Sequence, residues 1–258
     1  MIETNINVSN LLDGQIVLVT GAGQGNGRAI AQGVARSGVR VVVTDVQIDM
    51  AESTARQIRS HGGEASALHL DVTDAKECGS VAQQIVREIG PVNVLVNNAG
   101  IIIRENIDSP RAHENWRRIM DVNVNGIFNV VHAFLPALRQ TRGSIINVAS
   151  IASFVGVADT LGYSPSKGAV KLFTQALARE LAADGIRVNA IAPGVIETPM
   201  TQSTRDDPER IAAFLKRTPL GRVGQAEELV GPVVFLASAM ASYVNGVILP
   251  VDGGFLAV

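Results

Sequence analysis

Residues 20–27 read TGAGQGNG, a stretch with a glycine at every second position from Gly21 onward. The β-branched run Ile16–Val19 before it predicts a buried strand, and the apolar spacing of Arg28–Ser37 after it predicts a helix. Glycines at such a strand-to-helix turn permit a tight reversal and let a pyrophosphate approach the amide groups at the helix N-terminus. The spacing fits T-G-x-x-x-G-x-G and not the common G-x-G-x-x-G, and a P-loop is excluded because no Gly-Lys-Ser/Thr follows. By itself, the motif also fits a purely structural turn.

The rest of the chain alternates short β-branched runs with longer helical patterns. The further runs predict buried strands at Val39–Thr44, Ala65–Leu70, Val92–Val96, Ser144–Val148, Val188–Ala192 and Val247–Pro250. The helical patterns cover Met50–Ser60, Ala75–Ile89, Trp116–Arg139, Lys167–Ala183, Glu209–Lys216 and Ala226–Ala237. This alternation predicts an α/β fold, a single-domain Rossmann-type doubly wound parallel sheet with helices on both faces, over residues 1–258. A substrate-loop region is expected at about 194–217, because such sheets bind ligands beyond the carboxyl ends of their strands.

Composition excludes several classes of function. The chain has 258 residues, of which 47% are hydrophobic and 18% charged, and its net charge of −2 leaves no basic stripe for nucleic acid or an anionic membrane surface. A single cysteine, Cys78, excludes an internal disulfide, and the four scattered histidines lack metal-ligand spacing, so no metal is expected. The first 14 residues show no signal peptide and no run of 18 apolar residues occurs. A soluble cytoplasmic protein is therefore expected.

Asp45 follows the second predicted strand and lies 18 residues beyond Gly27. That is close to the roughly 20 residues expected for a carboxylate that bonds the adenosine ribose of a dinucleotide. A carboxylate there would repel a 2′-phosphate, and its neighbours Val46 and Gln24 carry no positive charge. The pattern favours NAD over NADP, although a solvated aspartate at a strand end is the plainer alternative.

Tyr163 and Lys167 are four residues apart and therefore share one face of a helix. A phenol has a pKa near 10, and a nearby ammonium would lower that pKa by stabilising the phenolate, which suits general acid–base catalysis. Ser150 lies thirteen residues upstream, just after a predicted strand, and can donate a hydrogen bond to a substrate oxygen. A lone Y-x-x-x-K is more often a pair on a helix surface.

Together these motifs resemble the short-chain dehydrogenase/reductase family over essentially the whole chain. Further motifs in the family's order are Asp71-Val72, Asn97-Asn98-Ala99-Gly100, Asn123-Val124-Asn125-Gly126 and Pro193-Gly194. The resemblance implies that Tyr163 is the catalytic acid and base and that Ser150 orients the substrate oxygen. It implies that Lys167 lowers the pKa of Tyr163 and bonds the nicotinamide ribose. Asn123 would hold a water of a proton relay. Asn26 departs from the family, which usually has an aliphatic residue there. The full set expected against the cofactor is Gly21, Gln24, Gly25, Asn26, Gly27, Asp45, Asp71, Val72, Asn98, Ala99, Gly100, Tyr163, Lys167, Pro193, Gly194, Ile196 and Thr198.

The substrate is expected to be a small alcohol or ketone. The stretch Asn97–Arg104, the step Gly221-Arg222 and the ending Val251–Leu256 resemble the gluconate 5-dehydrogenase and 2-deoxygluconate 3-dehydrogenase branch of the family. That resemblance implies a sugar acid, sugar or polyol, with Arg104 near its carboxylate or hydroxyls. A ketoreductase of acyl-thioesters or steroid-like ketones and a catalytically silent NAD-binding regulatory protein are the alternatives. The family resemblance also implies a homotetramer.

Overall fold

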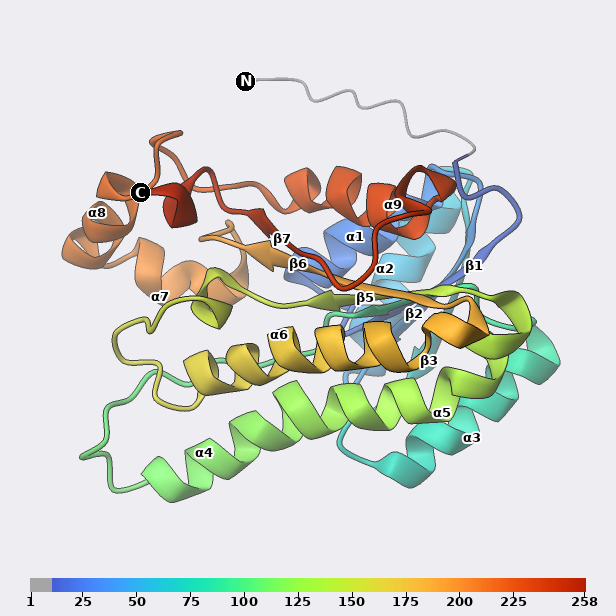
Figure 1. Cartoon of the computed structure of the whole chain (residues 1–258), viewed down its shortest axis with the longest axis horizontal. Helices are drawn as coiled ribbons and strands as arrows, with labels where there is room; N and C mark the ends of the chain where they lie inside the picture. Colours follow the sequence, from blue (N-terminus) through green and yellow to red (C-terminus); the bar gives the residue numbers. More distant parts are fainter. Residues whose placement is uncertain (1–10) are drawn as a thin grey trace.

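The computed structural model describes residues 11–258 and arranges them around one seven-stranded parallel sheet (Figure 1). The first ten residues of the stretch in which no signal peptide is expected lie outside the described part. The strands are β1 Ile16–Thr20, β2 Arg40–Asp45, β3 Glu64–His69, β4 Val94–Asn97, β5 Ser144–Val148, β6 Arg187–Pro193 and β7 Ile248–Val251. They lie in the order β3-β2-β1-β4-β5-β6-β7, which confirms the predicted doubly wound fold.

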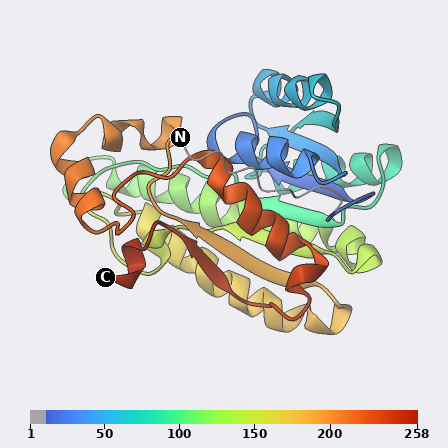
Figure 2. The ribbon, with the colours of Figure 1, turned by 90° about the horizontal axis from the view of Figure 1, so that it is seen from above.

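Helices cover both faces of this sheet. One face packs against α1, α2 and α9, and the other against α3, α5 and α6. Figure 2, seen from above, shows α1 and α9 side by side over the strands. The helices are α1 Gly25–Ala35, α2 Ile48–Ser60, α3 Ala75–Glu88, α4 Ala112–Met120, α5 Gly126–Thr141, α6 Tyr163–Glu180, α7 Gln202–Arg205, α8 Pro208–Lys216 and α9 Val230–Ala237.

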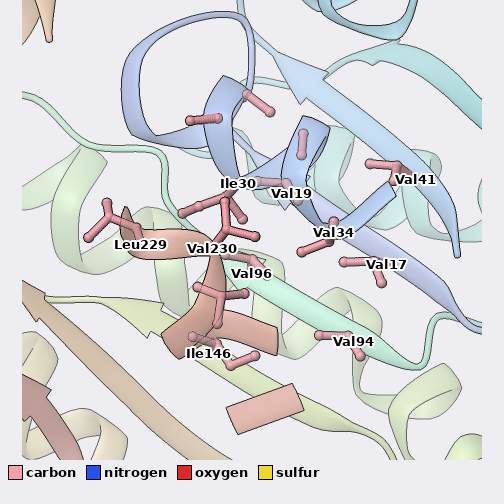
Figure 3. Close-up of a cluster of buried hydrophobic side chains, with 14 of the residues drawn as sticks. Val17, Val19, Ile30, Val34, Val41, Val94, Val96, Ile146, Leu229 and Val230 are labelled. Carbon is pink, nitrogen blue, oxygen red and sulfur yellow. The ribbon is translucent and has the colours of Figure 1, made fainter. Parts of the chain in front are cut away.

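The central strands β1, β4 and β5 are rich in Val and Ile, and both of their faces are buried. Val17 and Val19 of β1 point to the α1 and α9 side, and Leu18 points to the opposite side. Figure 3 shows the first of these cores, where valines of β1 and β4 meet Ile30 of α1 and Val230 of α9. Such packing removes apolar surface from water on both sides of the sheet and leaves only its edges open.

Two predictions about local structure are wrong. The runs in β3 and β7 are not fully buried, because these strands form the two edges of the sheet. The long helix expected over Trp116–Arg139 begins at Ala112 and is interrupted by a π-helical turn at Asp121–Asn125. The wider turn directs the Asn123 side chain inward, where it bonds the backbone of the segment after β4.

The order of the strands places a crevice at the carboxyl ends of β1 and β4. From β1 the chain proceeds to β2 and β3 on one side, and then returns so that β4 pairs with β1 on the other side. The connections that leave β1 and β4 diverge, and the space between them is the usual ligand crevice of such sheets. Among residues 11–258, no helix is both long and apolar enough to cross a membrane, and no cluster of His, Cys, Asp and Glu could hold a metal ion.

The contact between α1 and α9 leads to a test of the packing. A methyl group added at Gly33 would overlap the β- and γ-carbons of Val230. We expect Gly33→Ala to lower the free energy of unfolding by about 1–3 kcal/mol, because overpacking forces the two helices apart. Gly79→Ala in α3 is the matched control: its methyl meets nothing within 4 Å, so it should stabilise by about 0.5–1 kcal/mol. Urea unfolding measures both, and an unchanged Gly33→Ala stability would contradict the close contact.

Candidate active site

The side chain of Thr20 joins the glycine turn to the neighbouring strand. Its hydroxyl oxygen accepts the backbone N–H groups of Asn98 and Ala99, each at 3.1 Å. In return, the side-chain amide of Asn98 donates to the carbonyls of Thr20 and Gly21, each at 2.9 Å. These four hydrogen bonds hold the carboxyl ends of β1 and β4 together, where the crevice begins.

Three glycines of the turn are required for two different reasons. Gly21 and Gly25 have φ angles of +61° and +53°, which residues with a Cβ rarely adopt. Gly27 lies inside α1, where a Cβ would overlap the Asn98 side chain and the carbonyl of Gly21. Helix α1 can therefore start directly above the turn, with first-turn N–H groups that have no acceptor within the helix. Such a helix N-terminus suits a pyrophosphate.

A cleft of about 1840 Å³ runs along this edge of the sheet. It exceeds the 300–1,000 Å³ or so of a typical small-ligand pocket, so it has room for a dinucleotide and a small substrate. Of the residues that we expect to contact the cofactor, only Gly27 does not line the cleft, because it is buried in α1. The expected residues that do line the cleft are Gly21, Gln24, Gly25, Asn26, Asp45, Asp71, Val72, Asn98, Ala99, Gly100, Tyr163, Lys167, Pro193, Gly194, Ile196 and Thr198. This donor set fits a dinucleotide.

The carboxylate of Asp45 is held beside the glycine turn. One of its oxygens accepts the N–H of Gly23 at 2.9 Å, and the other accepts the N–H of Gln47 at 2.9 Å. The residues that follow it in the cleft wall, Val46 and Gln47, carry no charge. A ligand that reaches this end of the cleft therefore meets a fixed negative charge.

Ser150, Tyr163 and Lys167 lie together in the wall of the same cleft. Ser150 follows β5, and α6 begins at Tyr163, so that Tyr163 and Lys167 share its inner face. The Lys167 ammonium lies 5.7 Å from the centre of the Tyr163 ring and donates a hydrogen bond to the Val148 carbonyl at 2.7 Å. The structure thus assembles a phenol, a hydroxyl and an ammonium from two separate elements.

Burial dominates the electrostatics of Tyr163. It raises the pKa of the phenol, and the Ser150 hydroxyl and the positive charge of Arg104 oppose that rise. The expected lowering of this pKa by Lys167 stays a prediction, and the Lys167 ammonium donates its hydrogen bond to the Val148 carbonyl. Burial also lowers the pKa of Lys167, to about 8.

Asn123 supports the site from behind and is absent from the cleft wall. Its side chain accepts the N–H of Ile101 at 2.8 Å and donates to the carbonyl of Ile101 at 2.9 Å. It also donates to the Ser166 hydroxyl at 3.0 Å, and that hydroxyl donates to the Tyr163 carbonyl at 2.7 Å. Asn123 therefore connects the segment after β4 to the first turn of α6. Its expected role of holding a water stays a prediction.

Arg104 lies near Tyr163 without lining the cleft. One amino group of its guanidinium, Nη2, donates to the hydroxyl of Thr204 in α7 at 2.5 Å. The other, Nη1, is buried and has no acceptor within residues 11–258. Burial and the charge of Arg210 lower the pKa of Arg104. A buried donor without an acceptor is unfavourable for folding.

Sequence reasoning missed residues whose importance rests on distant partners. Thr20 is the first letter of the quoted motif, yet its partner Asn98 is 78 residues away. Pro199, Met200 and Thr201 line the cleft, and Thr204 bonds Arg104 from 100 residues away. The expected substrate-loop region at about 194–217 contains this group, but among these residues only Pro199, which predicts the start of a helical turn, gives a local signal.

The chain is similar to known proteins over nearly all of its length. A family model described as Enoyl-(Acyl carrier protein) reductase matches residues 21–256. The 2-dehydro-3-deoxy-D-gluconate 5-dehydrogenase of Bacillus subtilis (strain 168) is 42% identical over 247 residues, which are 95% of this chain and 96% of the relative. The cyclopentanol dehydrogenase of Comamonas testosteroni is 41% identical over 244 residues, 94% of this chain and 97% of the relative.

Solved structures match equally well. The crystal structure of a putative NAD(P)-dependent gluconate 5-dehydrogenase from Beutenbergia cavernae, with NADP bound at low occupancy, has a TM-score of 0.92. It is 41% identical in sequence and covers 98% of this chain and 100% of its own. The cleft and the glycine turn therefore lie within the shared fold.

The burial of Lys167 predicts a measurable pH dependence. Its pKa is about 8 in the folded protein against 10.5 for an ordinary lysine, so the folded state binds the proton more weakly than the unfolded chain. The unfavourable contribution of Lys167 to the free energy of unfolding is fully present below pH 8 and disappears as the pH rises to about 10.5. Relative to Lys167→Met, the wild type should gain up to about 3 kcal/mol of unfolding free energy over that range.

Urea unfolding of both proteins between pH 7 and 10.5 measures this change. Lys76→Met, on the exposed side of α3, is the control and should keep the wild-type pH dependence. Parallel curves for the wild type and Lys167→Met would contradict the weakened proton binding.

Proposed function

The chain belongs to the short-chain dehydrogenase/reductase family and is an oxidoreductase that acts on CH–OH groups, and we propose that it uses NAD to interconvert a secondary alcohol of a sugar acid and the corresponding ketone. One observation carries the proposal: Ser150, Tyr163 and Lys167 lie together in the wall of a cleft that fits a dinucleotide. The phenol can move a proton there while a hydride moves at the adjacent carbon.

Tyr163 is the proton donor and acceptor in this proposal. When bound, the nicotinamide supplies or accepts the hydride at the reacting carbon. In the reductive direction, the Tyr163 hydroxyl donates its proton to the carbonyl oxygen; in the oxidative direction, the phenolate takes the proton of the alcohol. The Ser150 oxygen accepts the N–H of Ala152 at 3.1 Å, and in this proposal its hydroxyl donates to the same substrate oxygen. Because burial raises the pKa of Tyr163, alkaline pH should favour oxidation.

The choice of NAD rests on Asp45. Its carboxylate is fixed by two backbone N–H groups at the end of β2, where a dinucleotide places its adenosine ribose. It would bond the two ribose hydroxyls and repel a 2′-phosphate. The relative from Beutenbergia cavernae is described as NAD(P)-dependent and was solved with NADP, so the preference of this chain needs a direct test.

The choice of a sugar acid rests on Arg104. The charge of Arg104 acts on Tyr163, and a guanidinium binds carboxylates through charge-assisted hydrogen bonds. Two of the similar proteins are named for gluconate-type substrates. A neutral cyclic alcohol is the second candidate, which the similarity to cyclopentanol dehydrogenase favours. These two candidates differ in whether Arg104 matters for binding.

We also propose that the chain forms a homo-oligomer, with the tetramer of the family as the expected state. Large apolar side chains stand exposed on three consecutive helices: Trp116 on α4, Phe128 on α5 and Leu172 on α6. Figure 1 shows these three helices together on one side of the sheet. Helices exposed in this way are commonly covered by another subunit.

Replacement of Tyr163 by phenylalanine tests the catalytic assignment. Tyr163→Phe should lower kcat by about 10²–10⁴-fold because the transferred proton loses its donor, while thermal stabilisation by NADH stays near the wild-type value. The other tyrosine, Tyr243, is fully exposed, so Tyr243→Phe is the control and should keep full activity. Formation of NADH with gluconate-type acids and cyclic alcohols is the assay, and a variant that keeps more than about a tenth of the activity would refute the role.

Replacement of Asp45 tests the cofactor preference. The wild type should turn over faster with NAD than with NADP at equal concentrations. Asp45→Ala combined with Val46→Arg should shift kcat/KM toward NADP, because it removes the repulsion and adds a partner for the phosphate. Val46→Arg alone separates the added charge from the lost carboxylate. A wild type that prefers NADP would overturn the assignment of Asp45.

A further inference from the structure

The strand order places the residues after β6 at one end of the cleft. Asp45 ends β2 and Ser150 follows β5, with β1 and β4 between these two strands in the sheet. Residues 194–201 leave β6 and therefore lie beyond β5, at the opposite end of the cleft from Asp45, and α7 begins directly after them (Figure 1). A dinucleotide whose adenosine lies at Asp45 would therefore place its nicotinamide half beside residues 194–201.

Thr198 is the residue of this stretch that faces the glycine turn. It lines the cleft, and a Cβ added at Gly25 would lie 3.5 Å from its Cβ. Gly25 is the first residue of α1, where the free N–H groups suit a pyrophosphate. A dinucleotide on the N-terminus of α1 therefore lies within reach of the Thr198 side chain, which belongs to the same cleft wall.

Arg205, the last residue of α7, holds the backbone at Thr198. Its Nη2 donates a hydrogen bond to the Thr198 carbonyl at 3.2 Å, and its Nη1 donates to the carboxylate of Glu197 at 3.3 Å. The rigid fork of a guanidinium suits two acceptors on adjacent residues, because both bonds form in one orientation of the side chain. Arg205 itself does not line the cleft.

Glu197 is in turn anchored to a part of the chain that follows α8. Its N–H donates to the Gly224 carbonyl at 2.8 Å, and its second carboxylate oxygen accepts the side-chain amide of Gln225 at 2.9 Å. The ion pair between Glu197 and Arg205 therefore connects α7 to a fixed neighbour. The bond from Arg205 to the Thr198 carbonyl then fixes the height of Thr198 over the glycine turn.

We propose that Arg205 is a positioning residue for the nicotinamide dinucleotide: it holds Thr198 opposite the N-terminus of α1, so that Thr198 contacts the nicotinamide half of the bound cofactor. This inference rests on the proposed function in one respect, that the cleft binds a nicotinamide dinucleotide, and it is independent of the substrate. Arg205 does not touch the cofactor, and its effect passes through Thr198.

The test compares a whole cofactor with its adenosine half. Arg205→Met should raise the Kd for NADH, measured by NADH fluorescence, by about tenfold, because Thr198 loses a charge-assisted hydrogen bond to its carbonyl. The inhibition constant of AMP, measured by displacement of NADH, should stay within about twofold of the wild type, because AMP lies at the Asp45 end of the cleft. An unchanged Kd for NADH, or an equal weakening of AMP, would overturn the inference.

Arg210→Met is the matched control. Arg210 of α8 also pairs with a carboxylate, that of Asp159 at 3.1 Å, and its side chain is 30% exposed against 25% for Arg205. Both substitutions remove a partly exposed ion pair and should lower the melting temperature of the ligand-free protein by less than about 4 °C. Only Arg205→Met should weaken NADH binding, and an equal loss in Arg210→Met would show that general loosening of α7 and α8 is the cause.

A double-mutant cycle tests whether Arg205 acts through Thr198. Thr198→Ala removes the side chain that Arg205 is proposed to position and should itself raise the Kd for NADH. On that background, Arg205→Met should raise the Kd by less than about twofold, because the positioned group is gone. Additive effects of the two substitutions would contradict the proposed route.

Titration of the wild type with NADH and NADPH separates this inference from the proposed function. If the wild type binds NADPH in preference to NADH, the choice of NAD fails, and the comparison of Arg205→Met with the wild type is decided with NADPH instead. If the wild type binds NADH and Arg205→Met binds it equally, only the role of Arg205 fails. If the wild type binds neither dinucleotide, both proposals fail.

Discussion

The connection between the carboxyl ends of β1 and β4 is the constraint on which the site depends. In a doubly wound sheet, these strands are neighbours in space but are separated by two complete strand–helix units in the chain. The hydroxyl of Thr20 and the amide of Asn98 satisfy four backbone groups that would otherwise be left unpaired at the strand ends. With the two ends fixed, α1 starts above the turn, and the segment after β4 leads toward Tyr163. The cleft is the space between the start of α1 and the segment that follows β4.

The site collects ionisable groups in a place where water is scarce. Lys167 is 4% exposed, burial raises the pKa of Tyr163, and Arg104 keeps a buried donor without a partner. Each of these features destabilises the folded chain by itself, because charged and polar groups lose hydration that the protein only partly replaces. The same features suit proton transfer and anion binding, since electrostatic effects are larger in a poorly solvated site. The two extensive apolar cores on either side of the sheet supply the stability that permits this arrangement.

The segment 199–216 is attached to the domain by two kinds of contact. Thr204 bonds the Arg104 guanidinium, and Arg210 forms an ion pair with Asp159. Phe255 near the C-terminus packs against Phe214 with ring centres 5.6 Å apart and lies under the Arg217 guanidinium at 4.3 Å. Polar and apolar contacts together hold the segment beside the cleft, whose wall includes Pro199, Met200 and Thr201.

The amino-acid sequence by itself determined the class of fold, the position of the glycine turn and the pairing of Tyr163 with Lys167. These features are local: a run of β-branched residues, a helical period or a four-residue spacing depends only on near neighbours in the chain. The tertiary structure alone decided that β3 and β7 are edge strands, that the helix around Asn123 opens into a π turn, and that Thr204 bonds Arg104. It also decided that burial raises the pKa of Tyr163, because desolvation depends on everything packed around the ring. Contacts between residues far apart in the chain leave no periodic pattern in the sequence, since each depends on the folding of all the elements between them.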